Sequence, residues 1–225
     1  MQPKPVDNAV KKRDGGLLTF TIFIIMFYIV HAAYSYEYAH SSFLQSSLIS
    51  QIVLRLGLWT LPVLVYLAFS GINPIGYLKL NKNVLSGVLW GVIIGAGILG
   101  INMLKVYVLS GQISINLDID RNFWWKGIIL VGLSEEVVFR GFILQKVNEG
   151  TGFWVANCIN AVLFVLVHVI GWVLLNQFST FKFRDMAVLF VFAFLQGFVL
   201  KKTKSLWACM IIHSFNNFTS VVINI

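Results

Sequence analysis

The sequence predicts an all-α fold, a polytopic transmembrane bundle of about seven helices with an intramembrane polar cavity. Of the 225 residues, 58% are hydrophobic and only 12% are charged, and the mean hydropathy is +0.81. A soluble domain has roughly 25% charged residues, and a disordered segment combines low hydrophobicity with high charge. Both classes are therefore excluded. Apolar blocks, all but one of which supply the roughly 20 residues needed to span a bilayer, complete the argument for a membrane protein.

The first element is a polar segment, residues 1–16, which we interpret as a cytoplasmic basic tail. The apolar run at 17–35 predicts the first spanning helix and begins a single transmembrane domain that covers 17–225. This run is longer than the roughly 7–15-residue core of a cleaved signal peptide, which favours a retained helix over a cleaved leader.

Six further apolar blocks, separated by polar or turn-forming segments, predict the remaining helices. They cover residues 49–70, 84–109, 123–145, 153–175, 186–200 and 205–224. In the block at 84–109, Gly87, Gly91 and Gly95 recur every four residues, which leaves a groove where a neighbouring backbone approaches closely. Residues 95–100 also spell G-x-G-x-x-G, but no strand precedes this pattern, so we exclude a dinucleotide site.

The net charge of +8 comes largely from Lys and Arg that lie between the apolar blocks. Because they are not gathered on one face, nucleic acid is not an expected partner. The loops on the amino-terminal side of the membrane contain Lys4, Lys11, Lys12, Arg13, Lys79, Lys82, Lys146, Lys201, Lys202 and Lys204, and the opposite side has chiefly Arg121, Lys182 and Arg184. The positive-inside rule then places the amino terminus in the cytoplasm. Lysine-rich inner loops of this style favour a prokaryotic plasma membrane.

Ionisable side chains inside a bilayer cost about 2.5–3.5 kcal/mol each on insertion scales, so each needs a partner or a function. The block at 123–145 contains Glu135, Glu136 and Arg140. Glu136 and Arg140 are four residues apart and share a helix face, which predicts an ion pair. Glu135 points about 100° away and has no partner within its helix. An unpaired, desolvated carboxylate suits a general base or a proton-carrying site.

Two later blocks add Phe164 with His168 and His213 with Asn217, each pair four residues apart on one helix face. From a rise of about 1.5 Å per residue, Glu135 and His213 lie at nearly one depth, while His168 lies roughly 8–10 Å deeper and is the outlier. Convergence of the three clusters is a hypothesis at this point.

Four other ionisable residues receive no function from the sequence. Arg55 and Lys105 are explained by snorkelling to a membrane interface, and His31 and His40 flank the outer end of the first helix. Cys158 and Cys209 lie in apolar blocks and match no metal or disulfide spacing.

The pattern Glu-Glu-x-x-x-Arg, then Phe-x-x-x-His, then His-x-x-x-Asn on successive helices resembles the CPBP (Abi) family of type II CAAX prenyl proteases and bacteriocin-processing enzymes. The resemblance covers about residues 123–220. It implies an intramembrane endopeptidase in which Glu135 activates a water with help from His168, and His213 with Asn217 stabilises the oxyanion. Glu136, Arg140 and Phe164 would then support the site.

The resemblance leaves the cofactor open. Glu135, His168 and His213 form a three-ligand set that leaves a zinc position open for water, and the family has been described both as metalloprotease and as glutamate-dependent protease. No H-E-x-x-H motif is present, which slightly disfavours zinc. We therefore expect either no cofactor or one divalent zinc ion.

The expected function is cleavage of a membrane-associated peptide or protein, in a cavity between the helices at 123–145, 153–175 and 205–224 that opens toward the cytoplasm. The main alternative is a non-catalytic bacteriocin self-immunity or docking protein on the same fold. A proton-coupled carrier would need inverted repeats, which are not evident. In the third alternative the polar residues only stabilise helix packing. That alternative requires Glu135, His168, His213 and Asn217 to lie together by coincidence. The lipid bilayer is the other expected partner, and the sequence does not determine the oligomeric state.

Overall fold

The computed structural model describes residues 6–113, 115–116, 118–119, 123–179 and 182–223. Over these residues the backbone is helical apart from turns, short irregular segments and one isolated bridge between Ile115 and Ile223. The all-α prediction is therefore confirmed. The amino-terminal half contains α1 (Val6–His40), α2 (Ser42–Ser46), α3 (Leu48–Arg55), η1 (Leu56–Thr60), α4 (Leu61–Phe69), α5 (Pro74–Tyr77) and α6 (Val84–Ser110). The other half contains η2 (Trp124–Leu130), α8 (Val131–Glu136), η3 (Val137–Ile143), α9 (Leu144–Thr151), α10 (Phe153–Leu174), α11 (Lys182–Thr203) and α12 (Leu206–Val222).

Helices form at all seven predicted apolar blocks, and five are long and apolar enough to cross a membrane. These five are Gly16–His40, Leu48–Phe69, Val84–Ser110, Phe153–Leu174 and Lys182–Thr203. The other two are the polar helical run from η2 to α9 and the shorter α12, and both carry predicted site residues. The chain is an integral membrane protein, with its most polar helices at the centre.

The segments η1, η2 and η3 are π-helical and lie inside otherwise continuous helices. A π-helical turn is wider than an α-helical turn and is frequently found at functional sites, because it changes the direction in which side chains project. Here η2 and η3 flank α8, which carries Glu135 and Glu136. The local backbone of the central helix is therefore irregular at the place where the sequence predicts the site.

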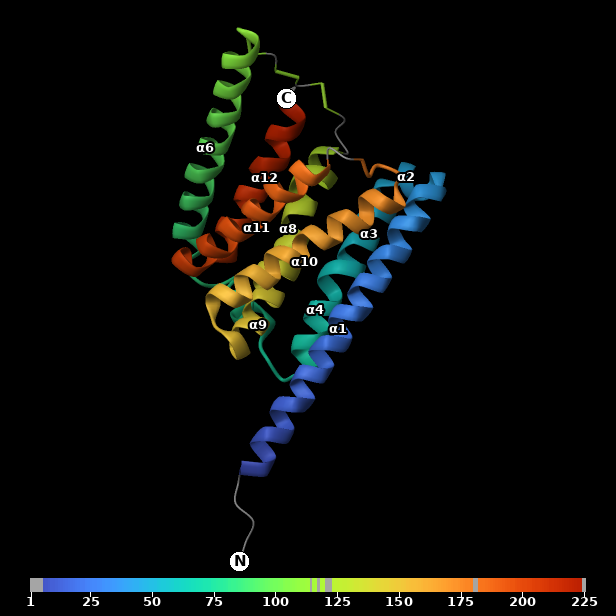
Figure 1. Ribbon diagram of the computed structural model, residues 1–225, viewed down its shortest axis with the longest axis vertical. Helices are drawn as coiled ribbons and strands as arrows, with labels where there is room; N and C mark the ends of the chain where they lie inside the picture. Colours follow the sequence, from blue (N-terminus) through green and yellow to red (C-terminus); the bar gives the residue numbers. More distant parts are fainter. Residues whose placement is uncertain (1–5, 114, 117, 120–122, 180–181, 224–225) are drawn as a thin grey trace, which may run out of the picture.

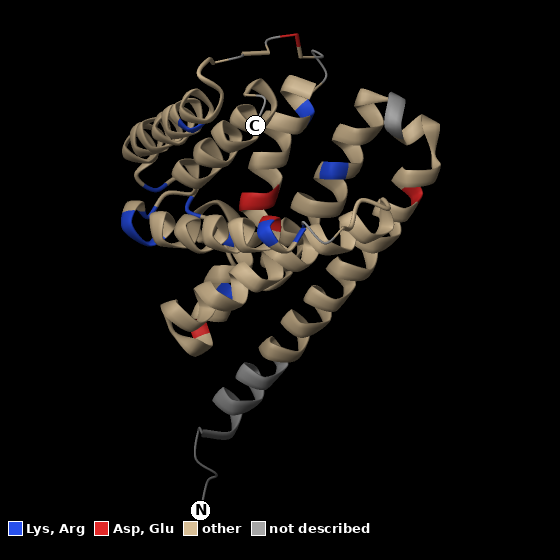
Figure 2. Cartoon of the chain, turned by 45° about the horizontal axis from the view of Figure 1, so that its top comes forward, with Lys and Arg blue, Asp and Glu red and all other residues tan. Residues whose placement is uncertain are grey.

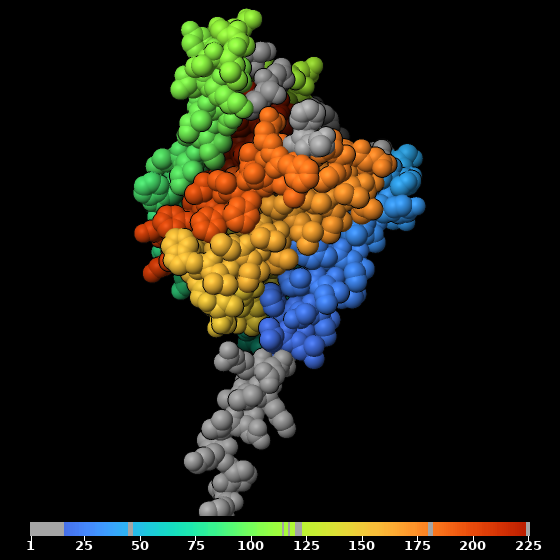
Figure 3. All heavy atoms as spheres, viewed as in Figure 1, coloured from blue at the N-terminus to red at the C-terminus, as the bar shows by residue number. Residues whose placement is uncertain are grey.

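The helices are arranged around α8 and α12, as Figure 1 shows. α6 lies along α12 on one side of the bundle, and α1, α3 and α4 lie on the other side. α10 crosses obliquely and packs against α1, α9 and α11. Figure 3 shows that α10 and α11 together cover one face of the molecule.

The predicted close approach at the glycines of α6 is confirmed, and the partner is α12. A Cβ atom added at Gly91 would lie 2.8 Å from Ile211 Cβ, and one at Gly95 would lie 2.5 Å from the ring of Phe215. A Cβ at Gly87 would collide with the side chain of Ser205. These three glycines are buried, so the helices approach more closely than any side chain would allow.

The two ends of the bundle differ in charge. α1 begins at one end, where α4, α9 and α11 finish and α6, α10 and α12 start. We call this the basic end, because it carries Lys79, Lys82, Lys146, Lys201, Lys202 and Lys204, and Figure 2 shows a group of blue segments on this side of the bundle. α1 and α10 finish at the opposite end, where η2 begins. Lys4 and Arg121, which were used in the prediction of orientation, lie outside the described residues. α1 starts at Val6, inside the segment interpreted as a tail.

Candidate active site

The centre of the bundle buries a row of polar side chains on α8 and η3. Glu135 is 5% exposed, and Glu136 and Arg140 are fully buried. The predicted ion pair within this helix is present, with Arg140 Nη1 3.0 Å from Glu136 Oε1. Because both side chains are shielded from water, the attraction between the two opposite charges holds the pair together. Removing one partner would leave the other charge buried and uncompensated.

Glu135 has a charged partner from another helix, which corrects the interpretation of Arg55 as a snorkelling residue. Arg55 Nη2 pairs with Glu135 Oε1, and Arg55 Nε donates to Ser134 Oγ at 2.9 Å. The guanidinium also lies 3.9 Å from the ring centroid of Trp59. Because α3 packs against η2, the arginine points into the bundle and does not extend toward a membrane surface.

The second oxygen of Glu135 faces two histidines. Glu135 Oε2 lies 3.9 Å from His168 Nε2 and 3.8 Å from His213 Nε2. It is buried and makes no direct hydrogen bond within the described part of the chain. These distances are too long for direct hydrogen bonds but suit a bridging water. The sequence-predicted convergence of Glu135, His168 and His213 is present in the structure.

His168 was the outlier in the depth estimate, and the inclination of α10 explains the error. The estimate assumed that each residue adds a full 1.5 Å of depth. α10 crosses the bundle obliquely in Figure 1, so its residues gain less depth along the membrane normal. His168 therefore reaches the level of Glu135.

Both imidazole rings are oriented by a bond to the nitrogen that faces away from Glu135. His168 Nδ1 lies 2.8 Å from the carbonyl oxygen of Phe164, and His213 Nδ1 lies 2.7 Å from Glu136 Oε1. Carbonyl and carboxylate oxygens only accept, so both Nδ1 atoms carry a proton and donate it. Each ring therefore presents Nε2 to Glu135.

Phe164 joins the buried charges to the histidines. Its fully buried ring lies 4.3 Å from the Arg140 guanidinium carbon and packs against the rings of His168 and His213, with centroid distances of 4.7 and 6.0 Å. The residues assigned to support, Glu136, Arg140 and Phe164, thus form one connected layer beside the histidines.

The side chain of Asn217 contacts the backbone of the central helix. Asn217 Nδ2 donates to the carbonyl oxygen of Gly127 at 3.0 Å. Gly127 belongs to η2 and lines the cavity beside Glu135. An amide nitrogen has two N–H bonds, so this contact occupies one of them and leaves the other to donate elsewhere.

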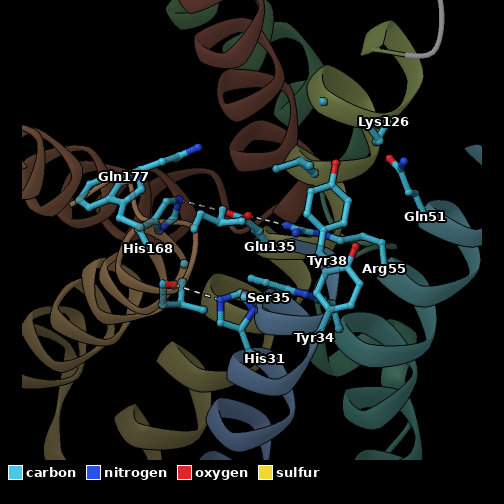
Figure 4. Close-up of a pocket in the computed structure, with 17 residues that line it drawn as sticks. His31, Tyr34, Ser35, Tyr38, Gln51, Arg55, Lys126, Glu135, His168 and Gln177 are labelled. Atoms are coloured by element: carbon cyan, nitrogen blue, oxygen red, sulfur yellow. Dashed lines mark hydrogen bonds and ion pairs between the residues drawn. The ribbon is translucent and has the colours of Figure 1, made fainter. Parts of the chain in front are cut away.

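A cavity of about 340 Å³ gives access to Glu135 and His168 (Figure 4). It extends to the ends of α1 and α10 and the beginning of η2, where Tyr38, Lys126 and the exposed Gln177 line it. This is the end opposite the basic end. The expectation that this cavity opens toward the amino-terminal side is therefore wrong, because the residues that line its outer part belong to the ends of α1 and α10 and the beginning of η2.

The carboxyl-terminal part of the chain, which carries most of these residues, matches a known family. Residues 121–219 match the family model described as type II CAAX prenyl endopeptidase Rce1-like. This part of the chain is therefore similar to the CAAX protease family. The resemblance found in the sequence is thereby confirmed, and the family implies a protease. Neither a curated protein nor a solved structure matches the chain.

The matched segment includes the Glu-Glu-x-x-x-Arg helix, His168, His213 and Asn217, but Arg55 and His31 lie outside it. His31 was given no function from the sequence, yet it lines the cavity and its Nε2 lies 3.1 Å from the carbonyl oxygen of Val167. The signal that would have found Arg55 is charge balance. Glu135 had no partner in its own helix, and Arg55 and Lys105 were two cations inside apolar blocks to which no partner had been assigned.

The candidate site residues do not form a closed metal site in the structure. The described residues include no group of three His, Cys, Asp or Glu side chains arranged to hold a metal ion. Ligands around a tetrahedral zinc, with bonds of about 2.0–2.1 Å, lie roughly 3.4 Å apart, whereas Glu135 Oε2 lies 3.8 and 3.9 Å from the two Nε2 atoms. Arg55 already neutralises the carboxylate that a cation would need.

Proposed function

We propose that this protein is an intramembrane endopeptidase in which Glu135 activates a water that attacks a peptide bond. One observation carries the proposal. Glu135 uses Oε1 for Arg55 and turns Oε2, without a direct hydrogen bond, toward the Nε2 atoms of His168 and His213. A water held among these three atoms would be close to a base and to two orienting groups.

The reaction follows from this geometry. The water oxygen bonds to the carbonyl carbon while its proton passes to Glu135 Oε2, and His168 Nε2 orients the water. The carbonyl oxygen becomes an oxyanion, which accepts from His213 Nε2 in its protonated form and from the second N–H of Asn217. Glu135 then returns its proton to the leaving amine as the carbon–nitrogen bond breaks.

Glu136 and Arg140 support this reaction without contacting the substrate. Glu136 accepts from His213 Nδ1, so it fixes the ring and stabilises the positive charge that the ring carries when it donates through Nε2. Arg140 neutralises Glu136, and the Phe164 ring packs against both the Arg140 guanidinium and the His168 ring.

The substrate is a membrane-associated peptide or protein. Tyr34, Trp59 and Trp172 line the cavity together with polar groups near Glu135, which suits a chain with apolar side chains around the scissile bond. We infer a prokaryotic plasma membrane with the amino terminus in the cytoplasm, because the basic end carries most of the lysines. In that orientation the cavity opens away from the cytoplasm.

The test is cleavage of a library of membrane-anchored reporter peptides by the purified full chain. Glu135→Gln and His213→Ala are each compared with the wild type and with Glu149→Gln, a control that removes an exposed carboxylate at the basic end. Loss of cleavage in the first two variants, with the control active and a chelator without effect, supports the glutamate mechanism. Full activity in Glu135→Gln would contradict the glutamate mechanism.

Two other outcomes favour other mechanisms. Loss of activity with a chelator, restored by zinc, would favour a metalloprotease. An absence of cleavage by every version would favour a non-catalytic self-immunity or docking protein on the same fold.

A further inference from the structure

A second cavity, of about 660 Å³, lies at the basic end of the bundle. The loop between α5 and α6 and the end of α11 surround it, and Leu144, Gln145 and Asn148 line it from the central helix. Four lysines line it: Lys79, Lys82, Lys201 and Lys204. No acidic residue is among its described lining residues. We call it the lysine cavity.

The acidic group nearest in sequence to this lining is already occupied. Glu149 lies on α9, and its carboxylate pairs with Lys146 Nζ at 2.7 Å and accepts from Tyr77 Oη at 2.7 Å. The positive charge of the four cavity lysines is therefore not balanced by a carboxylate in the lining. A cavity with this charge attracts an anion.

Lys79 and Lys204 lie in two loops, between α5 and α6 and between α11 and α12, whose backbones are held together by hydrogen bonds. Lys79 and Lys204 both have φ of +56°, a conformation that is uncommon for residues other than glycine. The carbonyl oxygen of Lys79 accepts from Leu206 N at 3.3 Å, and Asn83 Nδ2 donates to the carbonyl oxygen of Thr203 at 2.9 Å. The two loops are therefore joined, and the cavity is built before any ligand arrives.

Electrostatics within the cavity agree with this picture. Lys79 is half-buried, and burial together with the neighbouring Lys204 lowers the pKa of the Lys79 ammonium group. Burial and the like charge of Lys204 both make the charged form of Lys79 less favourable. A bound anion would relieve them by supplying the opposite charge.

The apolar part of the lining indicates which kind of anion fits. Leu144 and Leu200 are almost fully buried, and Phe153 begins α10. The spanning helices α6 and α11 begin and end beside the cavity, at Val84 and Thr203. The cavity thus lies at the level of the lipid headgroups, with cations around its rim and apolar side chains on its floor.

We propose that the lysine cavity binds a phosphate-bearing anion, and that the headgroup of an anionic phospholipid is the form that its apolar floor accommodates. The proposal is independent of the proteolytic activity. The competing explanation is that the lysines only set the orientation of the chain, in which case anions bind weakly and without dependence on this cavity.

The experiment measures Tm of the purified full chain in a neutral detergent. The probes are a short-chain phosphatidylglycerol, a phosphatidylcholine of the same chain length, and inorganic phosphate. A ligand at ten times its Kd raises Tm by roughly 3–5 °C in a chain of this size. We expect that shift with phosphatidylglycerol and not with phosphatidylcholine.

The test variant is Lys79→Asn with Lys204→Asn, because asparagine tolerates a positive φ and so preserves the loop backbone. The control, Lys105→Gln with Lys146→Gln, removes the same charge from lysines outside the cavity. The test variant should lose the shift and the control should keep it. Should the test variant fail to fold, Lys82→Gln, which removes an exposed cavity lysine, replaces it and should reduce the shift.

The probes distinguish the two sources of phosphate. Shifts with both phosphatidylglycerol and inorganic phosphate mean that the phosphate group is sufficient, and a shift with phosphatidylglycerol alone means that the lipid is the ligand. The proposal is overturned if neither probe raises Tm, if phosphatidylcholine is equally effective, or if a folded cavity variant keeps the full shift.

Discussion

Arg55 on α3 and Glu135 on α8 form an ion pair across 80 positions of the sequence. The pair lies in the cavity, with the side chains 15% and 6% exposed. It connects the amino-terminal half of the chain to the segment that matches the CAAX endopeptidase model, residues 121–219. Arg55 occupies one carboxylate oxygen, so it determines which oxygen faces the histidines.

Arg55→Gln should destabilise the protein by about 3 kcal/mol, because it leaves a buried carboxylate without its charged partner. Cleavage should fall by at least about tenfold, since Glu135 is then free to rotate. Thermal unfolding and reporter cleavage measure the two effects.

The companion variant Arg55→Met with Glu135→Met separates stability from catalysis. Replacing both members of a buried ion pair by apolar groups is often close to neutral in stability. The double variant should therefore recover the Tm and remain inactive. Wild-type activity in Arg55→Gln would show that the arginine does not position Glu135.

Glu136→Gln should reduce both stability and activity. The change leaves Arg140 buried without an anion and replaces a charged acceptor for His213 Nδ1, at a cost of about 3–5 kcal/mol. The measurement is Tm together with cleavage rate. As a comparison, Lys146→Gln breaks an exposed pair and should change stability by less than about 1 kcal/mol.

Asn217→Ala tests the proposed oxyanion donor. The loss of one donor lowers kcat by about 10²–10³, and KM should change little because the ground-state substrate makes weaker use of it. Steady-state kinetics on a cleaved reporter separate the two constants. Asn102→Ala removes an amide that bonds only within α6 in the described contacts and should leave kcat unchanged; an equal fall in both variants would contradict the assignment.

Gly91→Ala tests the packing of α6 against α12. The new Cβ would lie 2.8 Å from Ile211 Cβ, so the helices must separate, at a cost of about 1–3 kcal/mol. Gly97→Ala on the same helix meets nothing within 4 Å and should be neutral or slightly stabilising. Comparing the Tm of the two variants is sufficient, and equal values would contradict close packing at Gly91.

The sequence by itself determined the features that depend on composition or on the period of a single helix. Composition and the apolar blocks established an all-α membrane bundle. The glycines of α6 share a face because they are spaced by four, and Glu136 pairs with Arg140 for the same reason. The same spacing placed His213 and Asn217 on one face of α12.

Only the tertiary structure decided which residues meet across helices. The Arg55–Glu135 pair, the His213–Glu136 bond, the depth of His168 and the end at which the cavity opens all depend on the tilt and rotation of packed helices. Those quantities are set by many side-chain contacts together, whereas positions within one helix follow from its constant rise and turn. A partner in the same helix is therefore predictable from the sequence, and a partner in another helix becomes known only when the bundle is packed.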